Sequence, residues 1–443
     1  MFKEFQKTFR ISLPIIISNL AQISLGLIDS AMVGAVDYRQ LAAASLALNA
    51  IMIPQVAITG IAIAISPVTA IANGQNNTEK ASSILFNGFL LTLMVGVAMS
   101  VSLLLSHRMI FHLGQDADVA AYADPFYKLI AWSTIPLLMF AAVKQFCDGL
   151  ELTKTAMILS LASLPINALL NWIFIYGKFG LPRMELTGAG LGTLITRILI
   201  AIVLIIIVCT HKTFKKYISL RQKAWKVNLQ LWKELLEIGI PTGLQYGMEV
   251  AAFAVSAIMI GWMGATSQAA HQVAISLATA TFMAALGLSM GGSIRIANAF
   301  GRHDLAQVKA IGRSTFYGGL VYGIICGILL IIFRNQLPLL FTKNARVVSL
   351  TSSLLVIAAI FQISDATQAI GVGLLRGIKD AKTPTLFVAI AYWLIGIPVG
   401  YCLAIKLGWG ASGIWIGFVC GLTTSSVLLN SRFVKKVKEG FRV

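Results

Sequence analysis

Long apolar segments recur along the whole chain, and short polar segments separate them. Each apolar segment is close to the roughly 20 residues that a helix needs to cross the hydrocarbon core of a bilayer. The pattern predicts twelve membrane-spanning helices, at residues 11–36, 41–72, 83–106, 122–146, 156–178, 188–210, 238–264, 269–299, 314–333, 347–374, 384–405 and 410–431. We therefore expect an all-α integral membrane protein.

The composition supports a membrane protein and excludes a soluble globular one. Hydrophobic residues make up 57% of the 443 residues and charged residues 12%, whereas typical soluble domains carry about 25% charged residues. The first apolar segment is too long for a signal peptide and contains polar residues, so we expect it to be retained as a helix. The five cysteines form no CxxC pair, which argues against a disulfide framework or a structural zinc site.

The formal net charge of +18 predicts how the chain is oriented in the membrane. Basic residues gather before the first apolar segment, in the central polar stretch 211–228, and after the last apolar segment. Twelve spans place these three regions on one side of the membrane, and the positive-inside rule makes that side cytoplasmic. We therefore expect cytoplasmic termini, and we interpret the charge as a topology signal rather than a sign of nucleic-acid binding.

The two halves of the chain repeat each other. Residues 12–74 align with residues 239–301 at a constant shift of 227, without a gap. The matched positions are mostly proline, glycine and small residues, which set backbone shape and allow helices to approach closely. They include the pairs Pro14 and Pro241, Gly34 and Gly261, Gly60 and Gly287, and Ser66 and Ser293.

Six spans in each half mean that both halves start and end on the same side of the membrane, so the repeats are parallel. We expect an N-lobe at 1–210 with six helices, a basic cytoplasmic linker at 211–228, and a C-lobe at 229–443 with six more. Two six-helix bundles of this kind are expected to surround a central cavity, and rocking of one against the other would give alternating access.

Three acidic residues lie deep inside the predicted spans: Asp29, Glu249 and Asp365. A carboxylate at the centre of a bilayer costs on the order of 3 kcal/mol by insertion scales, so such residues usually have a role. Amide side chains stand near two of them at helical spacing, namely Gln245 before Glu249, and Gln362 and Gln368 on either side of Asp365. Each acid is either an ion or proton site in a wet cavity or a hydrogen-bond partner between packed helices.

Four segments resemble the multidrug and toxic compound extrusion family, in its NorM-like branch. The family's seventh helix resembles residues 238–274, IGIPTGLQYGMEVAAFAVSAIMIGWMGATSQAAHQVA. Its tenth helix and the following loop resemble residues 361–385, FQISDATQAIGVGLLRGIKDAKTPT. Its first helix resembles LGLIDSAMVG (25–34), and its fifth-to-sixth connection resembles NWIFIYGKFGLPRMELTGAGLGT (171–193).

The resemblance implies a secondary antiporter that expels small amphipathic organic cations in exchange for Na⁺ or H⁺. It implies a multi-pass protein of the bacterial inner (plasma) membrane that contacts membrane lipids, needs no cofactor and acts as a monomer. Which of the two ions drives transport stays open.

The resemblance also implies roles for residues in both lobes. Glu249 and Asp365 match the C-lobe carboxylates associated with Na⁺ coordination, and hard oxygen ligands suit that ion. Both acids could also carry protons. Phe282 stands where relatives often have a tyrosine that helps to shape this site, so the aromatic face is kept and the hydroxyl is lost.

In the N-lobe, the resemblance matches Asp29 with the family's acid and Asn167, Asn171 and Thr193 with the polar cluster around it. Protonation of this acid is linked in the family to bending of the first helix and to drug release. Asparagine pairs inside spans also serve as hydrogen-bonding contacts between helices, and both interpretations stay open.

Other residues are weaker candidates. Met283 and Met290 could line a plastic cavity suited to varied substrates. Arg295 is expected to snorkel toward the cytoplasmic side, His271 is expected to be structural, and Arg197 has no assigned role.

A membrane-embedded enzyme or an ATPase is disfavoured because the sequence contains no GxSxG, HExxH or Walker A motif. A channel is disfavoured because the buried acids occur singly rather than in rings. A flippase for lipid-linked oligosaccharides, from the same broader superfamily, is the alternative to a drug exporter.

Overall fold

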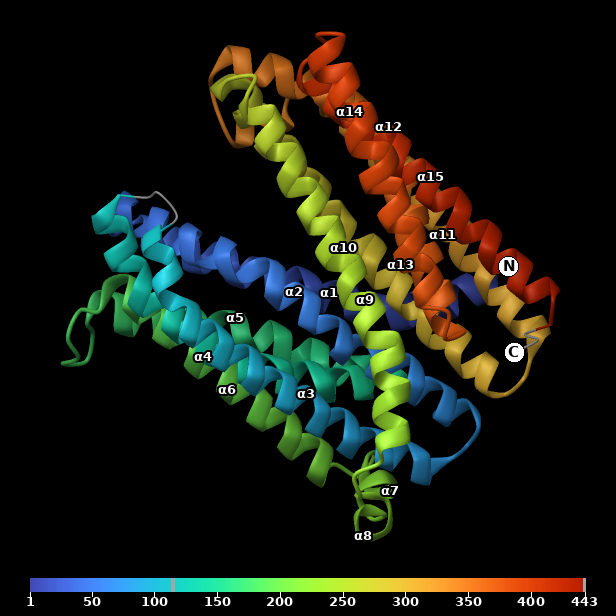
Figure 1. Ribbon diagram of the computed structural model, residues 1–443. Coiled ribbons are helices and arrows are strands. Elements are labelled where there is room, and N and C mark those ends of the chain that lie inside the picture. Colours follow the sequence, from blue (N-terminus) through green and yellow to red (C-terminus); the bar gives the residue numbers. More distant parts are fainter. Residues whose placement is uncertain (113–115, 441–443) are drawn as a thin grey trace. The chain divides into compact units, whose positions relative to one another are not determined.

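The computed structural model describes residues 1–112 and 116–440, and the twelve predicted spans are present as helices (Figure 1). Several helices extend beyond the predicted segments because polar residues at their ends continue the helix. The spans are Phe2–Gly34 (α1), Tyr38–Gly74 (α2), Thr78–His112 (α3, ending in a 3₁₀ turn), Ala117–Gly149 (α4), Thr153–Tyr176 (α5), Glu185–Thr210 (α6), Leu229–Gly261 (α9), Ala265–Gly301 (α10), Leu305–Ile332 (α11), Ala345–Gly377 (α12), Lys382–Lys406 (containing α13 and α14) and Ala411–Lys438 (α15). The all-α membrane fold is thus confirmed.

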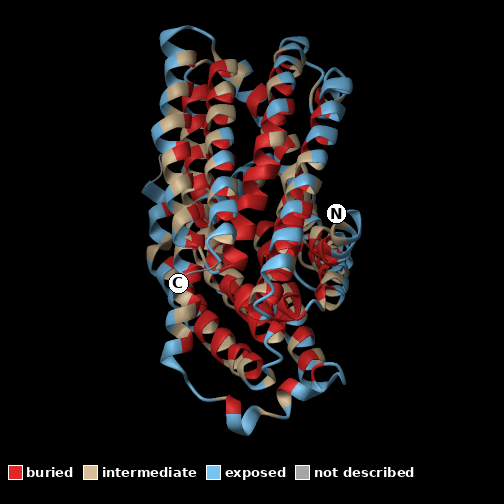
Figure 2. Ribbon diagram, turned by 90° about the vertical axis from the view of Figure 1, so that its right-hand side faces the viewer, coloured by how far each residue is buried: buried red, intermediate tan, exposed pale blue. Residues whose placement is uncertain are grey.

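Buried and exposed residues lie on different faces of the long helices. Figure 2 shows buried positions along some helix faces and exposed positions along others and in the connecting loops. Large apolar side chains are well represented among the exposed positions, and Leu105 is 80% exposed. Because an apolar side chain gains nothing from facing water, these surfaces fit contact with lipid.

The chain divides into two compact units whose boundaries lie inside helices. Unit 1 contains Met1–Ile16 and Leu244–Val443, and unit 2 contains Ile17–Gly243. The first part of α1 therefore packs in the unit formed by the second half of the chain, and the first part of α9 packs in the other unit. Ile16 and Gly243 are 227 positions apart, so both boundaries fall at the same place in the repeat.

Glycines make these helix contacts possible. A Cβ atom on Gly60 of α2 would come within 2.2 Å of the backbone nitrogen of Gly243 on α9, inside unit 2. The equivalent Gly287 of α10 meets Ile16 of α1 inside unit 1, where a Cβ atom would come within 2.4 Å of the Ile16 side chain. The duplication is therefore present in the packing as well as in the sequence.

The polar stretch 211–228 forms two short helices, α7 (Lys215–Ile218) and α8 (Arg221–Ala224), which pack against α3. Tyr217 is buried there, and its backbone oxygen accepts a hydrogen bond of 2.7 Å from the hydroxyl of Ser82. The segment expected to link two lobes is thus a folded part of unit 2.

Arg295 fixes the start of α1 to α10 within unit 1. Its guanidinium pairs with the carboxylate of Glu4 and donates a hydrogen bond of 2.9 Å to the hydroxyl of Thr8. The side chain is only 7% exposed, so the expected snorkelling of Arg295 is wrong. The cationic group finds its partners inside the unit instead of in the surrounding water.

The eleventh span is not a uniform α-helix. After α13 (Lys382–Ala389) it passes through a π-helical segment, Ile390–Gly396, then through α14 (Ile397–Tyr401) and a second π-helical segment, Cys402–Lys406. Pro398 lies at the start of α14 and lacks an amide hydrogen, which weakens the regular hydrogen-bond ladder. Such π segments are frequent at functional sites, and Tyr392 lies in the first of them.

Candidate functional site

The N-lobe residues picked out from the sequence come together in unit 2. The Asp29 carboxylate on α1 accepts a hydrogen bond of 2.6 Å from the side-chain amide of Asn171 and one of 2.9 Å from the hydroxyl of Thr193. The Asn171 amide also lies 3.3 Å from the side-chain oxygen of Asn167. Three helices, α1, α5 and α6, thus contribute to one polar cluster.

Local sequence explains why the cluster forms. Asn167 and Asn171 are one turn apart on α5, so they share a helix face, and both are fully buried. Gly192 precedes Thr193 on α6, and a Cβ atom there would come within 2.3 Å of the Asn171 side-chain oxygen. The absence of a side chain at Gly192 therefore lets α6 approach α5 closely enough for Thr193 to reach Asp29.

Two hydrogen-bonding atoms of this cluster have no partner among the described residues. The Asn167 side-chain nitrogen and the Asn171 side-chain oxygen are buried and have no hydrogen-bond partner there. One donor and one acceptor beside a carboxylate can bind a further polar group or water. The geometry therefore fits a site that takes up a proton or a small cation. It fits equally well a set of hydrogen bonds that holds α1, α5 and α6 together.

Arg197, which had no assigned role, lies one turn after Thr193 on α6. Its guanidinium donates a hydrogen bond of 2.6 Å to the hydroxyl of Ser133 on α4, and its charge acts on Asp29. The position of Arg197 relative to Thr193 was visible in the sequence, but the partner on α4 was not.

The C-lobe acids also come together, in unit 1. Glu249 on α9 and Asp365 on α12 are both buried and lie close enough for their charges to interact. One Glu249 carboxylate oxygen accepts hydrogen bonds of 3.0 Å from the side-chain amides of Gln245 and Gln368. Two of the three predicted glutamines thus hold Glu249, one from its own helix and one from α12.

The third glutamine, Gln362, has a different partner. Its side-chain oxygen accepts a hydrogen bond of 2.9 Å from the hydroxyl of Thr281 on α10. The backbone oxygen of Thr281 in turn accepts a hydrogen bond of 2.7 Å from the hydroxyl of Tyr322 on α11. The Gln362 side-chain nitrogen is buried and has no partner among the described residues. Sequence reasoning missed Thr281 and Tyr322, because nothing in the spacing along α12 indicates what α10 and α11 present to it.

An aromatic cluster lies next to the two acids. Phe253 stands one turn after Glu249, and Phe361 stands one turn before Asp365, so both spacings were visible in the sequence. The ring of Phe253 lies 4.8 Å from that of Phe418 and 5.9 Å from that of Tyr392. The further rings of this cluster belong to Trp415 and His271.

Phe282, Met283 and Met290 are half-buried on α10. Within residues 1–112 and 116–440, no ring contact or hydrogen bond joins any of them to Glu249 or Asp365. Their expected place in a cation site or a plastic cavity stays a prediction. His271 is buried against the Trp415 ring, in agreement with a structural role.

Arg376 lies beyond the predicted span 347–374, in the last turn of α12, and is 3% exposed. Its guanidinium lies 5.6 Å from the ring centroid of Tyr246 on α9, and its charge acts on Glu249 without forming an ion pair with it. One terminal nitrogen is buried without a hydrogen-bond partner in the described part of the chain. The predicted span ended at residue 374, which hid this buried cation.

Within the described residues, no three His, Cys, Asp or Glu side chains gather into a metal site. What the geometry offers is a pair of carboxylates in unit 1 and a single carboxylate in unit 2, each surrounded by amide and hydroxyl groups. This donor set suits a monovalent cation or a proton better than a tightly held divalent metal.

Twelve apolar helices, a duplicated scaffold and buried carboxylates in both units define a multi-pass membrane protein of the transporter type. The MatE family model matches the chain twice, at residues 14–173 and 241–402. The chain therefore belongs to the MatE family, as its resemblance to these transporters predicted, and each half carries one copy of the family's domain.

Several relatives are similar over nearly the whole chain. The multidrug resistance protein NorM of Photobacterium profundum is 33% identical, over 97% of this chain and 95% of its own length. NorM of Vibrio cholerae is 31% identical, with the same coverage. Among solved structures, the eukaryotic MATE transporter AtDTX14 has a TM-score of 0.88 at 22% identity, covering 99% of this chain and 98% of its own. A MATE protein in complex with MaL6 has a TM-score of 0.91 at 17% identity, with the same coverage.

Proposed function

We propose that this protein is a secondary multidrug efflux antiporter that exports small amphipathic organic cations in exchange for Na⁺ or H⁺. The observation that carries the proposal is the pair of buried carboxylates, Glu249 and Asp365, on two helices of one unit. Two negative charges in a medium of low dielectric repel each other, and a bound cation or proton removes that cost. The NorM relatives, described as multidrug resistance proteins, support the substrate class.

Coupling follows when the driving ion and the substrate compete for the same carboxylates. A cationic substrate would be attracted to Glu249 and Asp365, and its aromatic body would stack on Phe253 or Tyr392 beside them. Entry of Na⁺ or H⁺ would neutralise the acids and release the substrate. Transport then requires that the two ligands favour different states of the protein, which is alternating access of the two units.

Asp29 provides a second carboxylate in the other unit. Its hydrogen bonds join α1 to α5 and α6, so a change in its charge would change how α1 is held. We propose that proton or cation binding at Asp29 contributes to the release step, and that Arg197 moderates the charge of this cluster.

The basic stretch 211–228 and both termini are proposed to face the cytoplasm, by the positive-inside rule. With a bacterial inner (plasma) membrane as its location, the protein would draw its energy from an ion gradient and need no cofactor. We propose that it acts as a monomer.

The test is efflux of ethidium from proteoliposomes with Na⁺ and H⁺ gradients imposed separately. We expect wild-type protein to export the dye under at least one gradient, and Glu249→Gln, Asp365→Asn and Asp29→Asn to abolish gradient-driven export while keeping the protein folded. Glu439→Gln is the matched control, because this acid lies past the end of α15 with a side chain 48% exposed. Undiminished export by all three buried-acid variants contradicts the proposal.

The alternative, a flippase for lipid-linked oligosaccharides, is tested in the same vesicles. A flippase would move a fluorescent lipid-linked sugar and leave ethidium export at the background of empty liposomes. The drug-exporter proposal requires the opposite result.

A further inference from the structure

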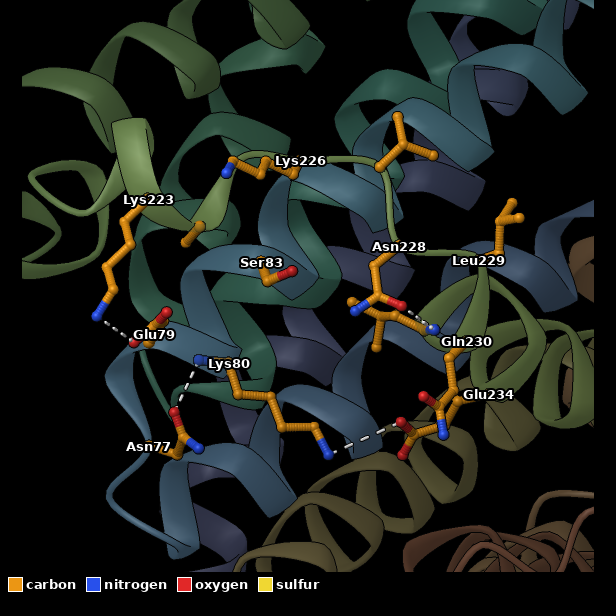
Figure 3. A pocket seen from close by; sticks show the side chains of 13 residues that line it. Asn77, Glu79, Lys80, Ser83, Lys223, Lys226, Asn228, Leu229, Gln230 and Glu234 are labelled. Atoms are coloured by element: carbon orange, nitrogen blue, oxygen red, sulfur yellow. Dashed lines mark hydrogen bonds and ion pairs between the residues drawn. The ribbon is translucent and has the colours of Figure 1, made fainter.

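A separate polar pocket lies at one end of unit 2, lined by none of the residues that bind Asp29. Its volume is about 860 Å³, and it is formed by the start of α3, the segment 223–228 and the start of α9 (Figure 3). Asn77 precedes α3, and Leu229 begins α9. The pocket is formed before the apolar segments predicted at 83–106 and 238–264, so we expect it to lie near one surface of the membrane.

Three lysines give the pocket a positive charge. The Lys223 ammonium lies 3.3 Å from Glu79, and the Lys80 ammonium lies 3.8 Å from Glu234. The Lys226 ammonium has no ion-pair or hydrogen-bond partner among the described residues (Figure 3). Three lysines against two glutamates leave a net charge of +1, and partly exposed ion pairs at such distances are weak enough for an anion to compete with them.

Two asparagines add neutral hydrogen-bond donors. The side-chain oxygen of Asn77 accepts a hydrogen bond of 2.8 Å from the backbone nitrogen of Lys80, and that of Asn228 accepts one of 3.1 Å from the backbone nitrogen of Leu231. Because both amide oxygens are used as helix caps, the amide NH₂ groups are left to donate. Ammonium and amide donors together match the oxygens of a phosphate group.

Apolar residues stand beside these cationic groups. Val227 is 56% exposed and Leu229 is 73% exposed, and both line the pocket. The neighbouring Trp225 is held in place, with its ring stacked 5.6 Å from that of Phe86 and its indole nitrogen donating to Ser82. A cationic pocket with exposed apolar residues near a membrane surface complements the two parts of an anionic phospholipid. The lysines suit its anionic headgroup, and the apolar residues suit its hydrocarbon.

We propose that this pocket binds the phosphate headgroup of an anionic phospholipid, with Lys223 and Lys226 as its main charged contacts. A soluble phosphate would use the lysines but would leave Val227 and Leu229 exposed to water. The lipid satisfies both groups of residues, because its glycerol and upper acyl chains can cover the apolar ones. The site is distinct from the buried acids and does not depend on which ion drives transport.

The test is native mass spectrometry of the full-length protein with phosphatidylglycerol, phosphatidylcholine or glycerol 1-phosphate added. We expect phosphatidylglycerol to bind in preference to phosphatidylcholine. The double variant Lys223→Gln/Lys226→Gln should lower its affinity by about thirtyfold, since each lysine near a membrane surface contributes about fivefold. Glycerol 1-phosphate at the same concentration should not displace the lipid.

The matched control is Lys212→Gln/Lys215→Gln, which removes the same charge from the same polar stretch at two exposed residues outside the pocket. It should keep wild-type affinity for phosphatidylglycerol. Equal losses in both double variants would show a diffuse charge effect and overturn the proposal, as would wild-type affinity in the pocket variant. Displacement of the lipid by glycerol 1-phosphate would assign the pocket to a soluble anion and overturn it as well.

Discussion

Asn171 on α5 donates its side-chain amide to the carboxylate of Asp29 on α1 over 2.6 Å. In unit 1, Gln368 on α12 does the same for Glu249 on α9 over 3.0 Å. The repeat does not produce this likeness, because a shift of 227 places Ser256 opposite Asp29 and Gln22 opposite Glu249. The scaffold is copied between the halves, while each unit has its own way of holding a buried acid.

The close approach at Gly192 predicts that a single added methyl group disturbs the Asp29 cluster. In Gly192→Ala, the new Cβ atom would lie 2.3 Å from the Asn171 side-chain oxygen, so Asn171 must move away from Asp29. We expect a loss of about 1–3 kcal/mol in the free energy of unfolding, the usual cost of overpacking, together with reduced ethidium export. Thermal unfolding in detergent and efflux assays measure the two effects.

Gly26→Ala is the control for this substitution. Gly26 lies on α1, three residues before Asp29, and has open space where a Cβ atom would be placed. Alanine there should leave stability unchanged or raise it by up to about 1 kcal/mol, because alanine favours a helix over glycine. Equal destabilisation by both substitutions would mean that the contact with Asn171 has no special role.

Substitutions of two threonines on α6 can distinguish the role of the hydrogen bond to Asp29 from the general effect of losing a hydroxyl group. Thr193→Val removes the 2.9 Å hydrogen bond to Asp29 and leaves a carboxylate oxygen short of a donor, at a cost of about 1–3 kcal/mol. Thr196→Val removes only a bond of 2.8 Å to the Gly192 carbonyl of the same helix. We expect Thr193→Val alone to impair gradient-driven export, and comparable export by the two variants would contradict a role for Thr193.

The sequence was a good guide to the spans and to the polar clusters, for physical reasons. Apolar length is tied directly to bilayer thickness, so twelve helices could be counted without knowing their packing. The spacing of Asn167 and Asn171 places them on one helix face. Their convergence with Asp29 and Thr193 rested on the family resemblance.

The division into compact units could not be predicted, because it depends on contacts between distant segments. A polar stretch such as 211–228 indicates a break between spans, but it does not say which half of α9 packs on which helices. That is decided by close approaches such as Gly60 against Gly243. Helix ends were missed for a related reason: Asp148 and Arg376 are polar, yet they continue their helices because each has a partner in the folded unit.

Lys144 and Asp148 form a buried ion pair on α4, with side chains 6% and 1% exposed and 3.1 Å between charged atoms. Removing one partner leaves an uncompensated buried charge, so Lys144→Met or Asp148→Leu alone should each cost about 3–5 kcal/mol in the free energy of unfolding. The double variant Lys144→Met/Asp148→Leu replaces the pair by apolar groups and should be close to wild type. Denaturation of the four members of this cycle measures the coupling, and additive losses would contradict it.

The pairing of Arg295 with Glu4 predicts that the start of α1 can be released from α10 by one substitution. Arg295→Met keeps a long apolar side chain but removes the ion pair with Glu4 and the 2.9 Å hydrogen bond to Thr8. We expect faster hydrogen exchange and faster proteolysis within residues 1–16, while the rest of unit 1 keeps its protection. Arg302→Met is the control, because Arg302 is exposed just after the same helix. Unchanged exchange in residues 1–16 of Arg295→Met would mean that apolar packing, such as Ile16 against Gly287, holds this segment without the ion pair.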